Sequence, residues 1–128
     1  MPSTSLTAPS PAGVGWVSSK VVRRAAVFME ENADQPLTVG TIAAAVGVGP
    51  RALQHAFHRH LGATPLAHLR DLRLGKAHEQ LGATAPAART TVRQVAAAWG
   101  FGNPHRFTVA YQKRYGHHPK VTLATDPA

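Results

Sequence analysis

The hydrophobic pattern in the last third of the chain predicts a short helix followed by a sharp turn. Val95, Ala96 and Trp99 share one face of such a helix, because helical residues three or four apart lie on the same side. Thr91 and the glutamine three residues later have the spacing of a capping box, which marks the helix start. Gly100 follows this helix and can adopt the positive φ that a sharp turn needs.

A second helix is predicted directly after this turn. Asn103 can cap its first turn, and Pro104 suits the first helical position, where its missing N–H costs nothing. One face is aromatic and carries Phe107, Tyr111 and Tyr115. The opposite face carries donors, cations and one valine: His105, Arg106, Val109, Gln112 and Lys113. We interpret the aromatic face as core, and a helix anchored in this way suits insertion into the DNA major groove.

The same pattern occurs twice along the chain. The segment IAAAVGV at residues 42–48 aligns with VAAAWGF at residues 95–101, and Thr38 precedes the first copy as Thr91 precedes the second. After a one-residue insertion the alignment pairs Leu53 with Phe107, Phe57 with Tyr111, Leu61 with Tyr115, Gly62 with Gly116 and Pro65 with Pro119. The sequence therefore predicts two copies of one helix-turn-helix unit.

The rest of the pattern predicts an all-α fold of about seven helices with no strand. A long linker helix begins at Thr64 and Pro65 and runs to about Leu81, which at ~1.5 Å per residue separates the two units by about 25 Å. Arg73 faces the apolar stripe of this helix, and we expect it to bond a buried carbonyl or carboxylate. We expect the buried stripe to contain Leu66, Leu69, Leu74, Ala77 and Leu81.

These elements divide the chain into two subdomains with short flanking segments. Residues 1–18 lack charge and are rich in Pro, Ser, Thr and Gly, which predicts a disordered leader or the stub of a linker. A helix over residues 20–31 is expected next, and the end of the chain after Pro119 shows only weak structure signals. The segments are the leader (1–18), the first helix-turn-helix subdomain (19–63), the linker helix (64–82), the second subdomain (83–123) and a tail (124–128). In the first subdomain we expect three residues to face inward: Leu53, Phe57 and Leu61.

Composition adds a strong positive charge to this picture. The formal net charge is +8 and the pI is about 11.2. None of the acidic residues lies within residues 80–125, which hold Arg89, Arg93, Arg106, Lys113, Arg114 and Lys120. A basic region without carboxylates attracts a polyanion, and DNA is the commonest candidate. Charge alone leaves a solvated basic surface open as the alternative.

Composition also argues against several other classes of protein. No apolar run approaches the ~18 residues that a transmembrane helix needs, and no secretory signal pattern occurs. The chain has no cysteine, which excludes disulfides and thiolate metal sites. His55 with His58, and His117 with His118, lack an acidic residue to complete a ligand set, so neither a metal nor another cofactor is expected. No nucleophile motif and no glycine-rich phosphate loop occurs, so we do not expect an enzyme.

The motifs resemble those of one known family. The two units, the intervening LRDLRLGKAHEQL and the segment GFGNPHRFTVAYQKRYGHHP resemble the DNA-binding domain of the AraC/XylS family of bacterial transcription regulators. The resemblance covers about residues 21–123. Its most specific parts are Gly100-Phe101, the aromatic ladder at positions 107, 111 and 115, and the closing Tyr-Gly-x-x-Pro of residues 115–119. It implies a monomer on one face of double-stranded DNA, with the second helix of each unit in successive major-groove segments.

The resemblance also assigns roles on DNA by position. The base-facing positions correspond to Arg51, Gln54 and His55 in the first unit and to Pro104, His105, Arg106 and Val109 in the second. Arginine pairs well with guanine and glutamine with adenine. Thr38 and Thr91 cap helices whose N-terminal amides would face phosphates. Further phosphate contacts are expected from Arg59, Arg93, Lys113 and Arg114.

Three positions depart from the family's pattern. His55 stands where the family usually has a basic residue, and Val109 stands where relatives often have arginine. Gly49 replaces the usual serine cap of the first recognition helix. We therefore expect the first unit to be the weaker or less specific reader of DNA.

Sequence-specific transcription regulation in the bacterial cytoplasm, on the nucleoid, is the leading hypothesis. Two alternatives stay open: a nonspecific architectural DNA-binding protein, and an interaction module that keeps the fold and binds a protein such as RNA polymerase. Family relatives often carry a ligand-sensing domain before this one. The chain is therefore expected to be a stand-alone activator or an excised C-terminal domain, monomeric on DNA unless a sensor domain dimerises it.

Overall fold

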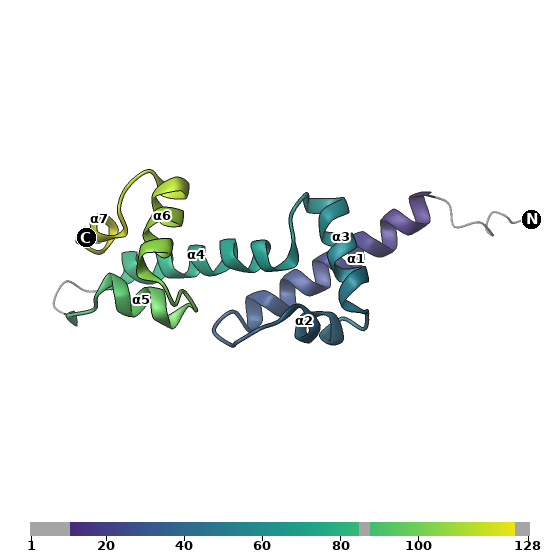
Figure 1. Cartoon of the computed structure of the whole chain (residues 1–128), viewed down its shortest axis with the longest axis horizontal. Coiled ribbons are helices and arrows are strands. Elements are labelled where there is room, and N and C mark those ends of the chain that lie inside the picture. Colours follow the sequence, from purple (N-terminus) through teal and green to yellow (C-terminus); the bar gives the residue numbers. More distant parts are fainter. Residues whose placement is uncertain (1–10, 85–87, 125–128) are drawn as a thin grey trace, which may run out of the picture. The chain divides into compact units, whose positions relative to one another are not determined.

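The protein is built from seven α-helices within the residues that the structure describes. The computed structural model describes the backbone of residues 11–84 and 88–124 and the side chains of residues 18–84 and 88–123. The predicted all-α fold is confirmed, since no strand occurs in these ranges (Figure 1). The helices are α1 (Pro11–Glu31), α2 (Val39–Ala45), α3 (Pro50–Leu61), α4 (Pro65–Ala83), α5 (Val92–Ala98), α6 (Pro104–Tyr115) and α7 (Pro119–Ala124).

The two ends of the helical part differ from the sequence prediction. Helix α1 begins at Pro11 rather than at residue 20, because proline suits the first helical position and no further proline interrupts the segment. Helix α7 occupies residues where only weak signals were expected, since six residues are too few to display a clear periodicity. Residues 1–10 of the predicted leader and residues 125–128 of the predicted tail lie outside the described residues.

The chain forms two compact units. The first contains α1, α2 and α3, which pack against one another, together with the first residues of α4. The second contains α5, α6, α7 and the rest of α4, together with the short segment Ala33–Pro36. Each unit has its own apolar core.

The core of the first unit lies among its three helices. Its buried residues are Val22, Ala25 and Met29 of α1, Ile42 and Ala43 of α2, and Leu53, Ala56 and Phe57 of α3. Two residues predicted to be buried are not. Leu61 is 47% exposed, because α3 ends there and Gly62 reverses the chain with a φ of 63°. Leu66 is 44% exposed, because Pro65 takes the buried place in the first turn of α4 and the next residue points elsewhere.

The core of the second unit is more aromatic. It contains Leu74, Ala77 and Leu81 of α4, Val95 and Ala96 of α5, and Phe107 and Tyr111 of α6. The ring centroids of Phe107 and Tyr111 lie 5.7 Å apart, and those of Tyr111 and the half-buried Tyr115 lie 4.6 Å apart. The interpretation of the aromatic ladder as core rather than as a stacking surface is therefore confirmed.

The Tyr111 hydroxyl is satisfied inside this core. Its oxygen lies 2.6 Å from Nδ1 of His78 and 2.6 Å from Oγ1 of Thr122. The imidazole of His78 also stacks on the ring of Tyr115, with centroids 4.0 Å apart. Burial raises the pKa of the Tyr111 phenol, so the ring keeps its proton and continues to hydrogen-bond α4 and α7. These contacts join three helices around one side chain.

The two turns between paired helices have the same hydrogen bonds. Gly47 and Gly100 adopt φ values of 75° and 84°. The amide of the residue after each glycine donates a hydrogen bond to a carbonyl of the preceding helix. Val48 N donates to Ala43 O at 3.0 Å, and Phe101 N donates to Ala96 O at 2.9 Å. The positive φ predicted for Gly100 is confirmed, and the repeat seen in the sequence is also a repeat of backbone geometry.

Arg73 holds a loop of the second unit in place. Its Nε donates to Ala33 O at 2.9 Å, and its Nη2 donates to Gln35 O at 2.5 Å. The structural role predicted for Arg73 is therefore confirmed, with backbone carbonyls as the acceptors. The guanidinium also passes close to the turn, since a Cβ on Gly100 would lie 3.2 Å from Nη1. Gly100 is thus required both by its φ and by this close approach.

Replacing Phe107 with alanine is expected to unfold the second unit more easily. The ring is fully buried, so Phe107→Ala should lower the free energy of unfolding by about 3–5 kcal/mol through lost burial and a cavity. Trp16, the other tryptophan of the chain, is replaced with phenylalanine, so that Trp99 fluorescence reports the unfolding of the second unit in urea. The matched control is Val109→Ala on the exposed face of α6, which should change stability by less than about 0.5 kcal/mol. Equal unfolding midpoints for the two variants would contradict the assignment of faces.

Candidate nucleic-acid interface

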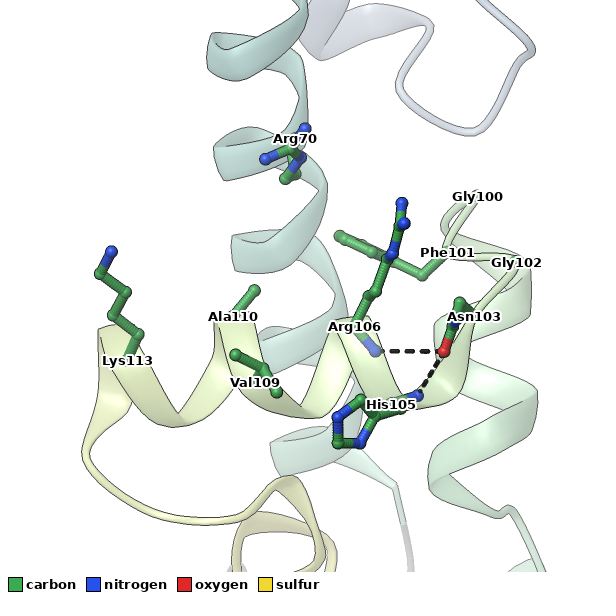
Figure 2. Close-up of a pocket in the computed structure, with 10 residues that line it drawn as sticks. All are labelled: Arg70, Gly100, Phe101, Gly102, Asn103, His105, Arg106, Val109, Ala110 and Lys113. Carbon is green, nitrogen blue, oxygen red and sulfur yellow. Dashed lines mark hydrogen bonds between the residues drawn. The ribbon is translucent and has the colours of Figure 1, made fainter.

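Helix α6 begins with a well-formed N-terminal cap. The Asn103 Oδ1 accepts hydrogen bonds from His105 N at 2.9 Å and from Arg106 N at 3.2 Å (Figure 2). Pro104 occupies the first turn, where no intrahelical donor is lost. The predicted cap is therefore confirmed, and it orders the turn of α6 that carries the first candidate DNA contacts.

Three of the four candidate base-facing residues of the second unit, His105, Arg106 and Val109, lie together on the outer side of α6, and Pro104 does not. His105, Arg106, Val109 and Lys113 are exposed, and Pro104 is half-buried. Phe107 and Tyr111 on the inner side are fully buried. Val109 is 51% exposed, which leaves its methyl groups available for contact. This face can present cationic, hydrogen-bonding and apolar groups to one partner, and the roles of these residues on DNA stay predictions.

A hollow of about 680 Å³ lies beside this face of α6. Phe101 and Ala110 are half-buried in its lining, and Arg106 and Lys113 rise from α6 (Figure 2). Arg70 contributes from α4 and was not among the DNA contacts predicted from the sequence. Its cationic side chain was visible in the sequence, but the approach of α6 to that part of α4 was not.

In the first unit, the candidate base-facing residues lie on α3. Arg51, Gln54 and His55 are exposed, as is the candidate phosphate contact Arg59. Gly49 caps α3 without a side-chain hydrogen bond, so this helix start lacks the support that Asn103 gives to α6. The apolar face of α3 is anchored by Leu53, Ala56 and Phe57.

The two capping threonines are exposed but already hydrogen-bonded. Thr38 Oγ1 accepts from Thr41 N at 3.0 Å. Thr91 Oγ1 accepts from Gln94 N at 3.1 Å, while Thr91 N donates to Gln94 Oε1 at 2.9 Å, so the predicted capping box is confirmed. Each hydroxyl therefore organises the start of a short helix.

The candidate phosphate-contacting cations differ in whether their side chains already bind other groups of the chain. Arg93 and Lys113 are exposed and make no hydrogen bond, ion pair or ring contact with the described residues. Arg114 is exposed too, but its Nη1 donates to Asp71 O at 2.9 Å and its guanidinium lies 5.4 Å from the Tyr115 ring centroid. Arg114 is thus held by its own chain, whereas Lys113 beside it is available to a ligand.

The described residues show no arrangement for a metal site or a membrane span. No three His, Asp or Glu side chains among them lie close enough together to hold a metal ion. None of the helices in the described ranges is both long and apolar enough to cross a bilayer.

Comparison with known proteins gives consistent matches over most of the chain. A family model described as a helix-turn-helix domain matches residues 42–125. The chain is 39% identical over 107 residues to the probable thc operon regulatory protein of Rhodococcus erythropolis, a match covering 84% of this chain and 32% of that protein. The chain therefore spans about a third of the length of that relative.

Solved structures of other proteins share this fold. A probable AraC family transcriptional regulator from Rhodopseudomonas palustris matches with a TM-score of 0.74 and 33% identity, covering 81% of this chain and 94% of that one. The DNA-binding domain of AdpA, solved in complex with a target DNA, matches with a TM-score of 0.66 and 23% identity, covering 84% of this chain and 89% of that one. At this lower identity the second match supports the fold alone.

Removing the cap of α6 is expected to destabilise the second unit moderately. Asn103→Ala loses both hydrogen bonds to the first turn and should lower the free energy of unfolding by about 1 kcal/mol. Asn103→Gly copies the glycine found at position 49 and should cost only about a few tenths of a kcal/mol. Thermal and urea unfolding of the two variants measure the difference. Two variants as stable as the native chain would show that the cap contributes nothing to stability.

Proposed function

The chain belongs to the AraC/XylS family of DNA-binding domains, and we propose that it binds specific double-stranded DNA sequences and thereby regulates transcription. The observation that carries this proposal is the division of α6 into a fully buried aromatic side and an exposed side with Arg106, Val109 and Lys113. A family relative named as an operon regulatory protein supports the regulatory role. As in that relative's class, the chain acts by binding and is not an enzyme.

The proposed interaction inserts α6 into the major groove. An α-helix fits the width of this groove, and the residues of its first turns face the base edges. Arg106 can donate two hydrogen bonds to guanine, and Val109 can contact a thymine methyl group. His105 and Pro104 stand in the same first turn and complete the proposed base-reading set.

The first unit is proposed to read a second site with α3. Arg51, Gln54 and His55 are exposed on this helix, and Gln54 has the donor and acceptor that adenine requires. The two helices would occupy successive major-groove segments about one helical turn apart, with the chain bound as a monomer. The uncapped start of α3 at Gly49 supports our expectation that this reader is the less specific of the two.

The mixture of side chains favours specific recognition over binding by charge alone. A purely architectural surface needs only cations, whereas these two helix faces also present Gln54, His105 and Val109. A specific binder keeps a preference of ~10³-fold or more over random duplex at physiological salt. An architectural protein would lose its affinity steeply as salt rises and would show no preference, and a protein-interaction module would not bind DNA. We expect the chain to act on the nucleoid in the cytoplasm.

Arg106 is expected to select one base. Arg106→Ala should weaken binding to the preferred duplex by about 1–3 kcal/mol and should relax selectivity at a single position of the site. Fluorescence anisotropy with duplexes substituted at each position measures the base profile. A profile identical to that of the native chain would remove Arg106 from the base-reading set.

Lys113 is expected to contribute equally to the affinity for every DNA sequence. Its ammonium is exposed and has no partner among the described residues, so we assign it to a phosphate. Lys113→Ala should weaken preferred and random duplexes by the same factor and reduce the slope of log affinity against log salt by about 0.9. An effect confined to the preferred duplex would show instead that Lys113 reads a base.

A further inference from the structure

Three cations without a hydrogen-bond or ion-pair partner among the described residues line the hollow beside α6. Arg106 and Lys113 come from α6, and Arg70 comes from α4 (Figure 2). All three are exposed, and their side chains make no hydrogen bond or ion pair with any described residue. The lining contains no acidic residue that could neutralise them.

Neighbouring cations of the same unit behave differently. Arg73, one turn further along α4, is committed to the carbonyls of Ala33 and Gln35. Arg114, next to Lys113, is committed to the carbonyl of Asp71 and to the ring of Tyr115. Arg73 and Arg114 therefore each hydrogen-bond a backbone carbonyl of the chain. Arg70 has no such acceptor among the described residues. A free guanidinium at the rim can bind an external anion without first breaking an internal contact.

The hollow is apolar between the charges. Phe101, Val109 and Ala110 provide carbon surface, and Asn103 lies at one end with its oxygen already used by the helix cap. A DNA strand has the matching alternation, with deoxyribose rings that accept apolar contact and phosphates that accept hydrogen bonds from cations.

We propose that Arg70 of the linker helix α4 is a phosphate-binding residue, and that the hollow it shares with α6 receives one sugar–phosphate strand of the bound duplex. The inference rests on the proposed DNA binding. If Arg106 lies in the major groove, the strand that borders this groove is the anion nearest to the other side of the hollow. Arg70 and Lys113 then hold that strand from two helices. The chain contacts DNA through its linker helix as well as through its recognition helices.

The test compares three variants of the whole chain by anisotropy titration over a range of salt concentrations. Arg70→Gln removes the charge and should weaken binding to both preferred and random duplexes by about fivefold to tenfold near 0.1 M salt, with a slope reduced by about 0.9. Arg70→Lys should remain within about twofold of the native affinity, because a phosphate accepts hydrogen bonds from an ammonium as well. Arg24→Gln is the matched control: it is an exposed arginine beside a different hollow, between α1 and α2, and should have little effect.

Duplexes with a single neutral methylphosphonate locate the contact. At one phosphate the native chain should lose affinity on neutralisation while Arg70→Gln loses none, because its contact is already absent. Unchanged affinity and slope for Arg70→Gln, or equal sensitivity of both proteins at every phosphate, would overturn the inference. A changed base profile in Arg70→Gln would overturn it as well, since it would place Arg70 on a base.

These outcomes are separate from failure of the proposed function. If the native chain shows no preference for any sequence, the proposal of specific recognition fails. The phosphate contact of Arg70 would still be measurable on random duplex, because phosphate binding does not depend on sequence. If the native chain is specific and Arg70→Gln matches it at every salt concentration, only the inference about Arg70 fails.

Discussion

The burial of Phe107 and Tyr111 determines what helix α6 can present to a partner. Both side chains are fully buried, and Tyr111 is further fixed by its hydrogen bonds to His78 of α4 and Thr122 of α7. A helix held by two residues four positions apart cannot rotate about its axis without exposing both rings. The opposite side, with Arg106 and Lys113, is therefore held at the surface. The packing of the core thus determines which residues form the candidate interface.

The two units share this arrangement but differ in how firmly the second helix of each is anchored. Both place a positive-φ glycine between paired helices, and both end the second helix at a left-handed glycine, Gly62 in one and Gly116 in the other. The second unit adds an aromatic core and the Asn103 cap, whereas the first has Leu53 and Phe57 beneath a helix that starts at Gly49 without a side-chain cap. A better-ordered helix loses less conformational entropy on binding, which favours α6 as the stronger reader.

Local signals in the sequence predicted the features that depend on short-range chemistry. The caps at Thr91 and Asn103, the turn at Gly100 and the buried faces of α5 and α6 are all confirmed, because each follows from residues within one or two helical turns. The exposure of Leu61 and Leu66 was not predicted, since it depends on where α3 ends and how Pro65 enters α4. The position of Arg70 beside α6 depends on packing between residues far apart in the chain, which periodicity does not reveal.

Selection of bound duplexes from a random pool tests the central claim that both recognition helices read DNA. We expect enrichment of two short motifs about one helical turn apart, with selectivity relaxed at one position of the stronger motif in Arg106→Ala and the other motif unchanged. Enrichment of one motif alone would contradict the claim that α3 reads bases. No enrichment, with binding that disappears as salt rises, would contradict sequence-specific recognition altogether.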